Sequence, residues 1–221
     1  MSTHPALPPA GYGIRFARPD ESGSIAALLA RAFADDPVMA WMIPGAADRE
    51  RRIARYFTLA QRQQRPRAGG VRVAATVEGR LLAAALWSGP GRWEPSPVRE
   101  LAALPRYARV FGLGGMQRAA EVQNAMHEAH PEAPHWYLLS VGTDPRLQGA
   151  GVGSALVRQQ LADCDRLGQP AYLESSKVAN VPFYEGLGFR VTGELRIPAG
   201  GPTVWPMWRE PGPAAGPATT G

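Results

Sequence analysis

The stretch from Val141 to Leu156, VGTDPRLQGAGVGSAL, is the feature that most limits what this chain can fold into. A strand-like apolar segment ends there, a turn with three closely spaced glycines follows, and an amphipathic helix is expected from Val152. Glycines let backbone N–H groups approach an anion closely, and the helix N-terminus adds roughly 0.5 of a positive charge. The stretch therefore predicts a pyrophosphate site at the end of a strand in an α/β fold.

Three nucleotide-binding motifs compete for this stretch, and a fourth interpretation needs no ligand. An ATP-binding P-loop requires a lysine directly before Ser154, where this chain has none. A dinucleotide-binding turn requires GxGxxG early in the chain, whereas these glycines follow GxGxG two-thirds of the way along. The pattern Q-x-x-G-x-G is met by Gln148, Gly151 and Gly153. Alternatively, the glycines serve only the conformation of the turn.

Strand and helix patterns alternate along the rest of the chain. Strands are expected over 12–17, 71–77, 81–87, 136–143, 171–174, 189–194 and 203–209. Helices are expected over 25–33, with Asp20 as N-cap, and over 37–42, 47–64, 97–111, 115–129, 152–167 and 181–185. Hairpins and helical crossovers both occur, so we expect a mixed central sheet with flanking helices. One domain is expected over 12–211, with flexible Pro-rich ends at 1–11 and 212–221.

Charge and composition exclude several partners. The formal net charge of +5 favours an anionic partner, either nucleic acid or a phosphate-rich cofactor. The basic residues are scattered and not interleaved with aromatic ones, so no nucleic acid is expected. A single cysteine, Cys164, excludes a disulfide framework, and the four histidines lack metal-ligand spacing. No run approaches ~18 apolar residues, so a cytoplasmic protein without a membrane partner is expected.

Three segments in order, WYLLSVGTDP, QGAGVGSAL and LESSKVANVPFYEGLGF, resemble the GNAT acetyltransferase family over residues 136–189. RAFADDP, AYLESS and TVWPMWREP extend the likeness to the puromycin N-acetyltransferase type, whereas residues 89–130 carry little of it. The resemblance implies the GNAT fold, an α/β (α+β) fold whose mixed sheet contains a splayed strand pair. It also implies acetyl-CoA as the acetyl donor.

The resemblance also implies which residues hold acetyl-CoA. The strand segment Val141, Gly142 and Thr143 would pair with the pantetheine arm through the backbone of its first and last residues. The pyrophosphate would lie on main-chain N–H groups of Gln148, Gly149, Ala150, Gly151, Val152, Gly153 and Ser154. Asn180 would lie near the pantetheine. Its place before a short helix separately predicts an N-cap, and capping alone is the alternative role.

Acyl transfer to an amine requires a neutral amine, stabilisation of an oxyanion and a proton for the leaving sulfur. Tyr184 matches the family tyrosine near the sulfur and is the expected proton donor, although a core aromatic beside Phe183 and Phe189 fits it as well. The N–H of Val141 is the expected oxyanion donor. Glu174 matches a glutamate of the puromycin type and is the expected proton acceptor, or else a structural carboxylate. Other candidate bases are Asp35, Glu94, His127, His130 and His135.

The expected function is transfer of acetyl from acetyl-CoA to a primary amine of a small molecule, in particular an aminonucleoside antibiotic such as puromycin, which would confer resistance. The alternatives are a protein or peptide amine as acceptor, or a catalytically silent acyl-CoA-binding sensor. A monomer or a homodimer is expected. An apolar acceptor pocket is expected from Trp41, Met42, Trp87, Trp93 and Met116.

Overall fold

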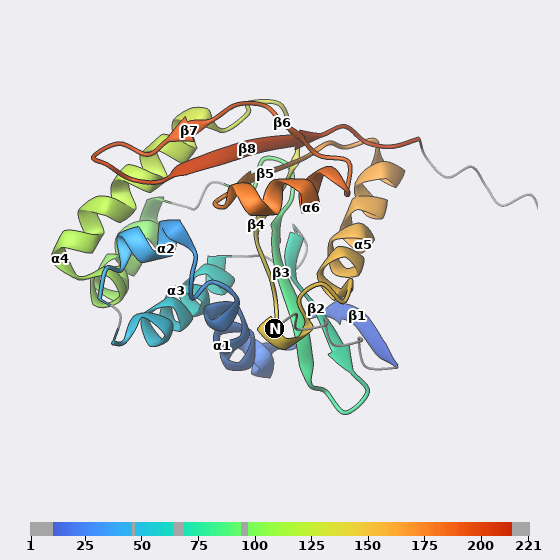
Figure 1. Cartoon of the computed structure of the whole chain (residues 1–221), viewed down its shortest axis with the longest axis horizontal. Coiled ribbons are helices and arrows are strands. Elements are labelled where there is room, and N and C mark those ends of the chain that lie inside the picture. The colour runs from blue at the N-terminus through green and yellow to red at the C-terminus, as the bar shows by residue number, and fades with distance from the viewer. Residues whose placement is uncertain (1–10, 46, 64–68, 94–96, 214–221) are drawn as a thin grey trace, which may run out of the picture.

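The computed structural model describes residues 11–45, 47–63, 69–93 and 97–213 (Figure 1). Its strands are β1 Tyr12–Phe16, β2 Gly69–Thr76, β3 Leu81–Ser88, β4 Trp136–Thr143, β5 Ala171–Ser175, β6 Arg190–Val191, β7 Leu195–Arg196 and β8 Thr203–Arg209. Its helices are α1 Ser22–Ala32, α2 Pro37–Met42, α3 Arg49–Gln63, α4 Pro97–Ala129, α5 Val152–Leu167 and α6 Val181–Glu185. Short 3-10 turns are η1 Pro19–Glu21, η3 Pro145–Leu147 and η4 Val178–Asn180. The expected flexible ends lie largely outside the described residues.

The strands form a mixed sheet in the order β1-β2-β3-β4-β5-β8-β6, with β7 paired to β8. Neighbouring strands are antiparallel from β1 to β4 and from β5 to β8, and β4 and β5 are parallel. The predicted mixed sheet is therefore confirmed. The parallel contact is brief, because only Trp136↔Ala171 and Tyr137↔Tyr172 are paired.

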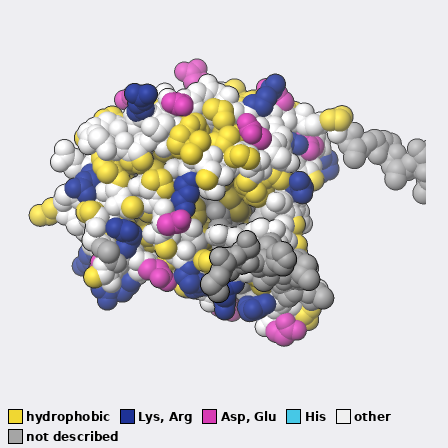
Figure 2. All heavy atoms as spheres, in the orientation of Figure 1, with side chains coloured by type: hydrophobic (Ala, Val, Ile, Leu, Met, Phe, Trp, Pro, Cys, Tyr) yellow, Lys and Arg dark blue, Asp and Glu magenta, His cyan; other side chains and the backbone are white. Residues whose placement is uncertain are grey.

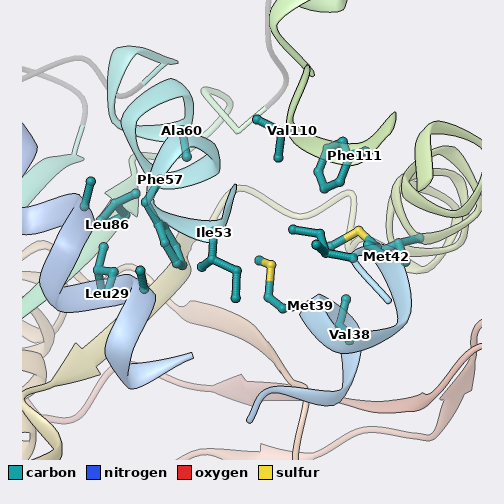
Figure 3. Packing of buried hydrophobic residues seen from close by; sticks show 14 of the residues in the cluster. Leu29, Val38, Met39, Met42, Ile53, Phe57, Ala60, Leu86, Val110 and Phe111 are labelled. Carbon is teal, nitrogen blue, oxygen red and sulfur yellow. The ribbon is translucent and has the colours of Figure 1, made fainter. Parts of the chain in front are cut away.

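Helices cover both faces of the sheet, which explains why β3 is apolar from Leu81 to Trp87. Ala84 and Leu86 pack with α1, α2, α3 and α4 in one buried cluster (Figure 3). Ala83, Ala85 and Trp87 point the other way, into a second cluster with α5. A strand buried on both faces needs no polar alternation.

Helix α5 spans Val152–Leu167, as predicted, and buries one apolar side. Gly168 ends it in a left-handed conformation (φ 62°). Two arginines fix its outer side. Arg72 of β2 donates from Nε to Gln160 Oε1 (2.9 Å) and from Nη2 to Asp163 Oδ2 (2.8 Å). Arg209 of β8 makes a bidentate pair with Asp165 (2.7 and 2.9 Å). These contacts hold the C-terminal half of α5 against β2 and β8.

Two local predictions were wrong. Asp20 does not cap α1, because residues 19–21 form η1 and Glu21 occupies the N-cap position. The expected strand 189–194 is reduced to the two residues of β6, because its next partner on β8 would be Pro206, which has no N–H to donate. By contrast, the two helices expected within residues 97–129 are confirmed, because the helical run is interrupted at Gly112, whose backbone is not helical (φ 68°).

Candidate active site

Strands β4 and β5 separate directly after the Tyr137↔Tyr172 pair. Opposite β3, Leu138 faces Trp87 and Ser140 faces Leu86, so β4 carries one extra residue between them, Leu139. A bulge of this kind bends a strand and increases its twist. The bulge therefore lies where β4 leaves β5, and it leaves one edge of β4 without a strand partner.

Main-chain groups of two residues face this open edge. Asp144 donates its N–H to Leu82 O of the β3 side (2.8 Å). Because successive residues of a strand point their N–H and C=O groups to opposite sides, Gly142 also faces β3. Val141 and Thr143 therefore present their N–H and C=O groups to the open edge.

The glycine at position 142 has a packing explanation. A Cβ built there would lie 2.8 Å from Leu29 Cδ2 and 2.9 Å from Ala32 Cβ of α1. No side chain fits between β4 and α1 at this point. Glycine at this position therefore allows α1 to pack closely against the strand that carries the open edge.

The turn from Gln148 to α5 provides unpaired N–H groups. Gly149 and Gly151 both adopt φ 81°, which glycine alone tolerates easily. The first helical donor is Ala155, whose N–H bonds Gly151 O (2.9 Å). The three preceding N–H groups, of residues 152–154, have no partner within the helix. Ala150 differs, because its N–H already donates to Leu147 O (3.2 Å).

The open edge, the turn and α6 enclose one cleft of about 520 Å³. Most of the expected site residues line it, namely Val141, Gly142, Thr143, Gln148, Gly149, Gly151, Gly153, Ser154, Glu174, Asn180 and Tyr184. Ala150 and Val152 do not line it, and the side chain of Val152 is buried in the core. The volume lies in the range of pockets for small molecules and cofactors.

Tyr184 of α6 is partly buried beside Phe183 and Phe189, with ring centroids 4.9 and 6.2 Å away. Burial raises the pKa of its hydroxyl, and the negative charge of Asp36 raises it further. The phenol therefore stays protonated at neutral pH. Asn180 lies at the N-cap position of α6, but its side chain makes no capping hydrogen bond, so that expectation was wrong.

Two adjacent carboxylates line the cleft from the α1–α2 connection. Asp36 is buried, accepts the Met39 N–H at the start of α2 (2.9 Å) and accepts the hydroxyl of Ser176. Asp35 pairs with Lys177 Nζ (2.6 Å). Burial raises the pKa of Asp36, and the hydrogen bond from Ser176 opposes that rise. The sequence analysis missed Asp36, although Asp-Pro at 36–37 is a typical helix start.

Glu174 of β5 also lines the cleft, and two of the other candidate bases stand behind it. Its side chain is 2% exposed, and its Oε1 lies 3.8 Å from His130 Nδ1. His130 Nε2 in turn lies 3.0 Å from His135 Nε2. His127 is exposed on α4. Glu94 lies outside the described residues.

The expected apolar acceptor pocket is not where the sequence analysis placed it. Met42 and Trp87 are buried in the two core clusters, and Trp41 and Met116 pack against the first of them. Trp93 stacks on His130 with ring centroids 3.6 Å apart. None of these five side chains lines the cleft.

Basic side chains do not form one patch on the face shown in Figure 2, where Lys and Arg are scattered singly. No helix in the described part of the chain is long and apolar enough to span a membrane.

Residues 115–210 match the family model described as an acetyltransferase (GNAT) domain. A stretch of 54 residues is 44% identical to an uncharacterized N-acetyltransferase of Schizosaccharomyces pombe and covers 24% of this chain. That stretch covers 22% of the yeast protein, so the match spans about a fifth of this curated relative.

Solved structures match over most of the chain. A protein of Corynebacterium glutamicum ATCC 13032, described as histone acetyltransferase HPA2 and related acetyltransferase, is 28% identical with a TM-score of 0.71. That match covers 91% of this chain and 97% of the other. The mosquito arylalkylamine N-acetyltransferase-like protein 5b has a TM-score of 0.54 at 14% identity, over 90% of this chain and 100% of that chain. The predicted GNAT fold is thus confirmed.

Proposed function

Because the chain carries a GNAT acetyltransferase domain over residues 115–210, we propose that it transfers acetyl from acetyl-CoA to a primary amine of a small molecule. The domain and its acetyltransferase relatives support an N-acetyltransferase enzyme. Members of this family take the acetyl group from acetyl-CoA, a donor that fits the expected cytoplasmic location.

One observation carries the proposal: an open strand edge leads directly to the exposed N–H groups at the start of α5, within a single cleft. An extended amide-containing arm can pair with Val141 and Thr143 as an added strand does. A pyrophosphate can accept hydrogen bonds from the N–H groups of residues 152–154, where the helix dipole also favours negative charge. Gly153 lets the start of α5 lie close to the end of β4, since a Cβ there would lie 2.7 Å from Thr143 Oγ1.

Acetyl-CoA supplies an acetyl thioester, and the residues around it supply proton transfer and orientation. Tyr184 holds a proton on its hydroxyl for the leaving sulfur. Glu174, on the facing strand, takes a proton from the amine. The N–H of Val141 on the open edge stabilises the negative charge that develops on the carbonyl oxygen.

The cleft favours a small cationic acceptor. Asp35, Asp36 and Glu174 line it together with Lys177, so carboxylates outnumber cations around the acceptor. The pairs Asp35–Lys177 and Asp36–Ser176 join two connections that are distant in sequence. An extended peptide needs an open groove on the acceptor side of the cleft. The two pairs connect the two walls of the cleft on that side.

Within this class, an aminonucleoside antibiotic such as puromycin is our narrower proposal, with resistance as the consequence. It rests on the segments RAFADDP, AYLESS and TVWPMWREP. A protein amine is the second candidate, because the Corynebacterium glutamicum protein at 28% identity is described as a histone acetyltransferase and related acetyltransferase.

Release of free CoA from acetyl-CoA, followed with a thiol reagent, tests the proposal. Purified protein is supplied with puromycin, a short polyamine, a histone-tail peptide or no amine. The proposal predicts thiol release that depends on a small amine, with puromycin preferred. Release with the peptide alone would favour the second candidate, and binding of CoA without release would indicate a silent sensor.

A further inference from the structure

Two histidines lie buried behind Glu174, and no role in the proposed reaction has been given to them so far. His130 follows the end of α4 and its side chain is 2% exposed. His135 precedes β4 and is buried. The three side chains form a row, with His130 in the middle, from the wall of the cleft into the protein.

The hydrogen-bond partners fix the protons on both rings. His135 Nδ1 lies 2.6 Å from Ala133 O, which only accepts, so this nitrogen carries a proton. Burial lowers the pKa of His135, so the ring is neutral and its Nε2 holds a lone pair. His130 Nε2, 3.0 Å away, must then be the donor. The remaining nitrogen of a neutral His130, Nδ1, therefore turns a lone pair toward Glu174.

Glu174 Oε1 is the natural partner of that lone pair. The oxygen is buried and has no hydrogen-bond partner among the described residues. It lies 3.8 Å from His130 Nδ1, which is beyond hydrogen-bond length but within ion-pair distance. The Nδ1 lone pair and the carboxylate oxygen are both hydrogen-bond acceptors, so they repel each other unless a proton lies between them. The pair is therefore built to take up one proton.

We propose that Glu174 and His130 act as one proton acceptor for the substrate amine, and that His135 is a positioning residue that fixes the tautomer of His130. The inference rests on the proposed function. As the amine nitrogen bonds to the acetyl carbon, its N–H bond breaks and the proton passes to the Glu174 carboxylate and on to His130 Nδ1. The pair ends as carboxylate and imidazolium, while Tyr184 separately supplies the proton that the sulfur takes as its bond to carbon breaks.

The surroundings of His130 suit such an imidazolium. Trp93 stacks on the ring, and Tyr137 of β4 and Tyr172 of β5 meet it edge to face with centroids 5.0 Å away. Among the described residues, its titratable neighbours are these two tyrosines, His135 and Glu174. Burial and the negative charge of Glu174 raise the pKa of both tyrosines, so both stay neutral. Within this part of the chain, Glu174 is thus the charged group that faces His130.

Nitrogen-15 NMR of the imidazoles tests the proton assignment without any turnover. In alkaline buffer, the proposal predicts the Nε2–H tautomer for His130 and the Nδ1–H tautomer for His135. On acidification, the new proton of His130 should appear at Nδ1, the nitrogen that faces Glu174. A neutral His130 with its proton on Nδ1, or one protonated on both nitrogens throughout, would overturn the proposal even if the protein is an active acetyltransferase.

Kinetics with a matched control test the role of the pair. His127 lies one turn earlier on α4 and contacts the same Trp93 (5.3 Å between centroids), but it is exposed. We expect His130→Gln to lower kcat about 10²-fold, to move the acid limb of the pH–rate profile downward and to leave KM for acetyl-CoA unchanged. His127→Gln should behave as the parent protein. His135→Gln, which can still accept from His130, should retain more activity than His135→Phe. Equal behaviour of the two α4 variants would contradict the proposal.

Discussion

Gly142 of β4 and Leu29 of α1 approach so closely that a Cβ on the glycine would lie 2.8 Å from Leu29 Cδ2. The same Cβ would lie 2.9 Å from Ala32 Cβ, so the helix fills the space behind the strand completely. The main-chain N–H and C=O groups of the flanking residues Val141 and Thr143 face the open edge. Helix α1 therefore supports the strand segment that we propose binds the donor.

Gly142→Ala tests this support. The added methyl group has no space, so we expect the free energy of unfolding to fall by about 1–3 kcal/mol. Gly13→Ala is the matched control, because it also lies in a strand and a Cβ there would meet nothing within 4 Å. Urea unfolding measures both. Equal stabilities of the two variants would show that α1 does not pack on β4 as described.

Gly151→Ala tests the proposed pyrophosphate site at the start of α5. Gly151 and Gly200 both have positive φ (81° and 77°), and in both a Cβ would meet no atom within 4 Å. Alanine should strain both sites alike, by about 1 kcal/mol. Only Gly151 lines the cleft, so we expect Gly151→Ala alone to weaken CoA binding, by about tenfold or more, in calorimetric titrations. Similar CoA affinity in Gly151→Ala and Gly200→Ala would argue against this pyrophosphate site.

Tyr184→Phe removes the proposed proton donor and keeps the ring. We expect kcat to fall about 10²-fold, the lower range for a lost general acid, with KM for acetyl-CoA little changed. Because burial and the charge of Asp36 raise the pKa of Tyr184, the parent enzyme should not lose this proton below about pH 10. Tyr12→Phe on β1 is the control. Steady-state kinetics that fail to separate the two variants would remove Tyr184 from the mechanism.

Glu21 should make stability depend on pH. Its carboxylate accepts from Arg15 (2.8 and 2.5 Å) and from the Arg18 N–H (2.7 Å), and the Arg15 contact chiefly lowers its pKa from 4.5 to about 2. A carboxyl whose pKa is lower in the folded than in the unfolded state stabilises the folded state at pH values above its unfolded-state pKa. This contribution is lost as the pH falls through the folded-state pKa. We expect a loss of up to about 2 kcal/mol between about pH 4.5 and pH 2, after discounting for partial exposure.

Urea unfolding across that pH range checks the prediction with two variants. Glu21→Gln should remove this part of the pH dependence. Glu128→Gln makes the same charge change on an exposed part of α4 and should keep it. If Glu21→Gln retained the full slope, the pair with Arg15 would not be its source.

The sequence predicted the parts of the site that depend on neighbouring residues. The positive φ of Gly151 and the start of α5 follow from glycine chemistry and helical periodicity within a dozen residues. The bulge at Leu139 depends on pairing with β3 and leaves no local signal. The contact of Asp36 with Ser176 joins residues 140 apart, and the row from Glu174 to His135 needs three elements to meet. These features are set by tertiary packing, which residue spacing cannot report.

Amide hydrogen exchange with and without saturating CoA tests most directly whether the open edge of β4 and the start of α5 bind the donor. The account predicts slower exchange on CoA addition in peptides covering 141–143 and 149–155, and little change across β1 and β2. Unchanged exchange in both of those segments, in folded protein at saturating CoA, would contradict it.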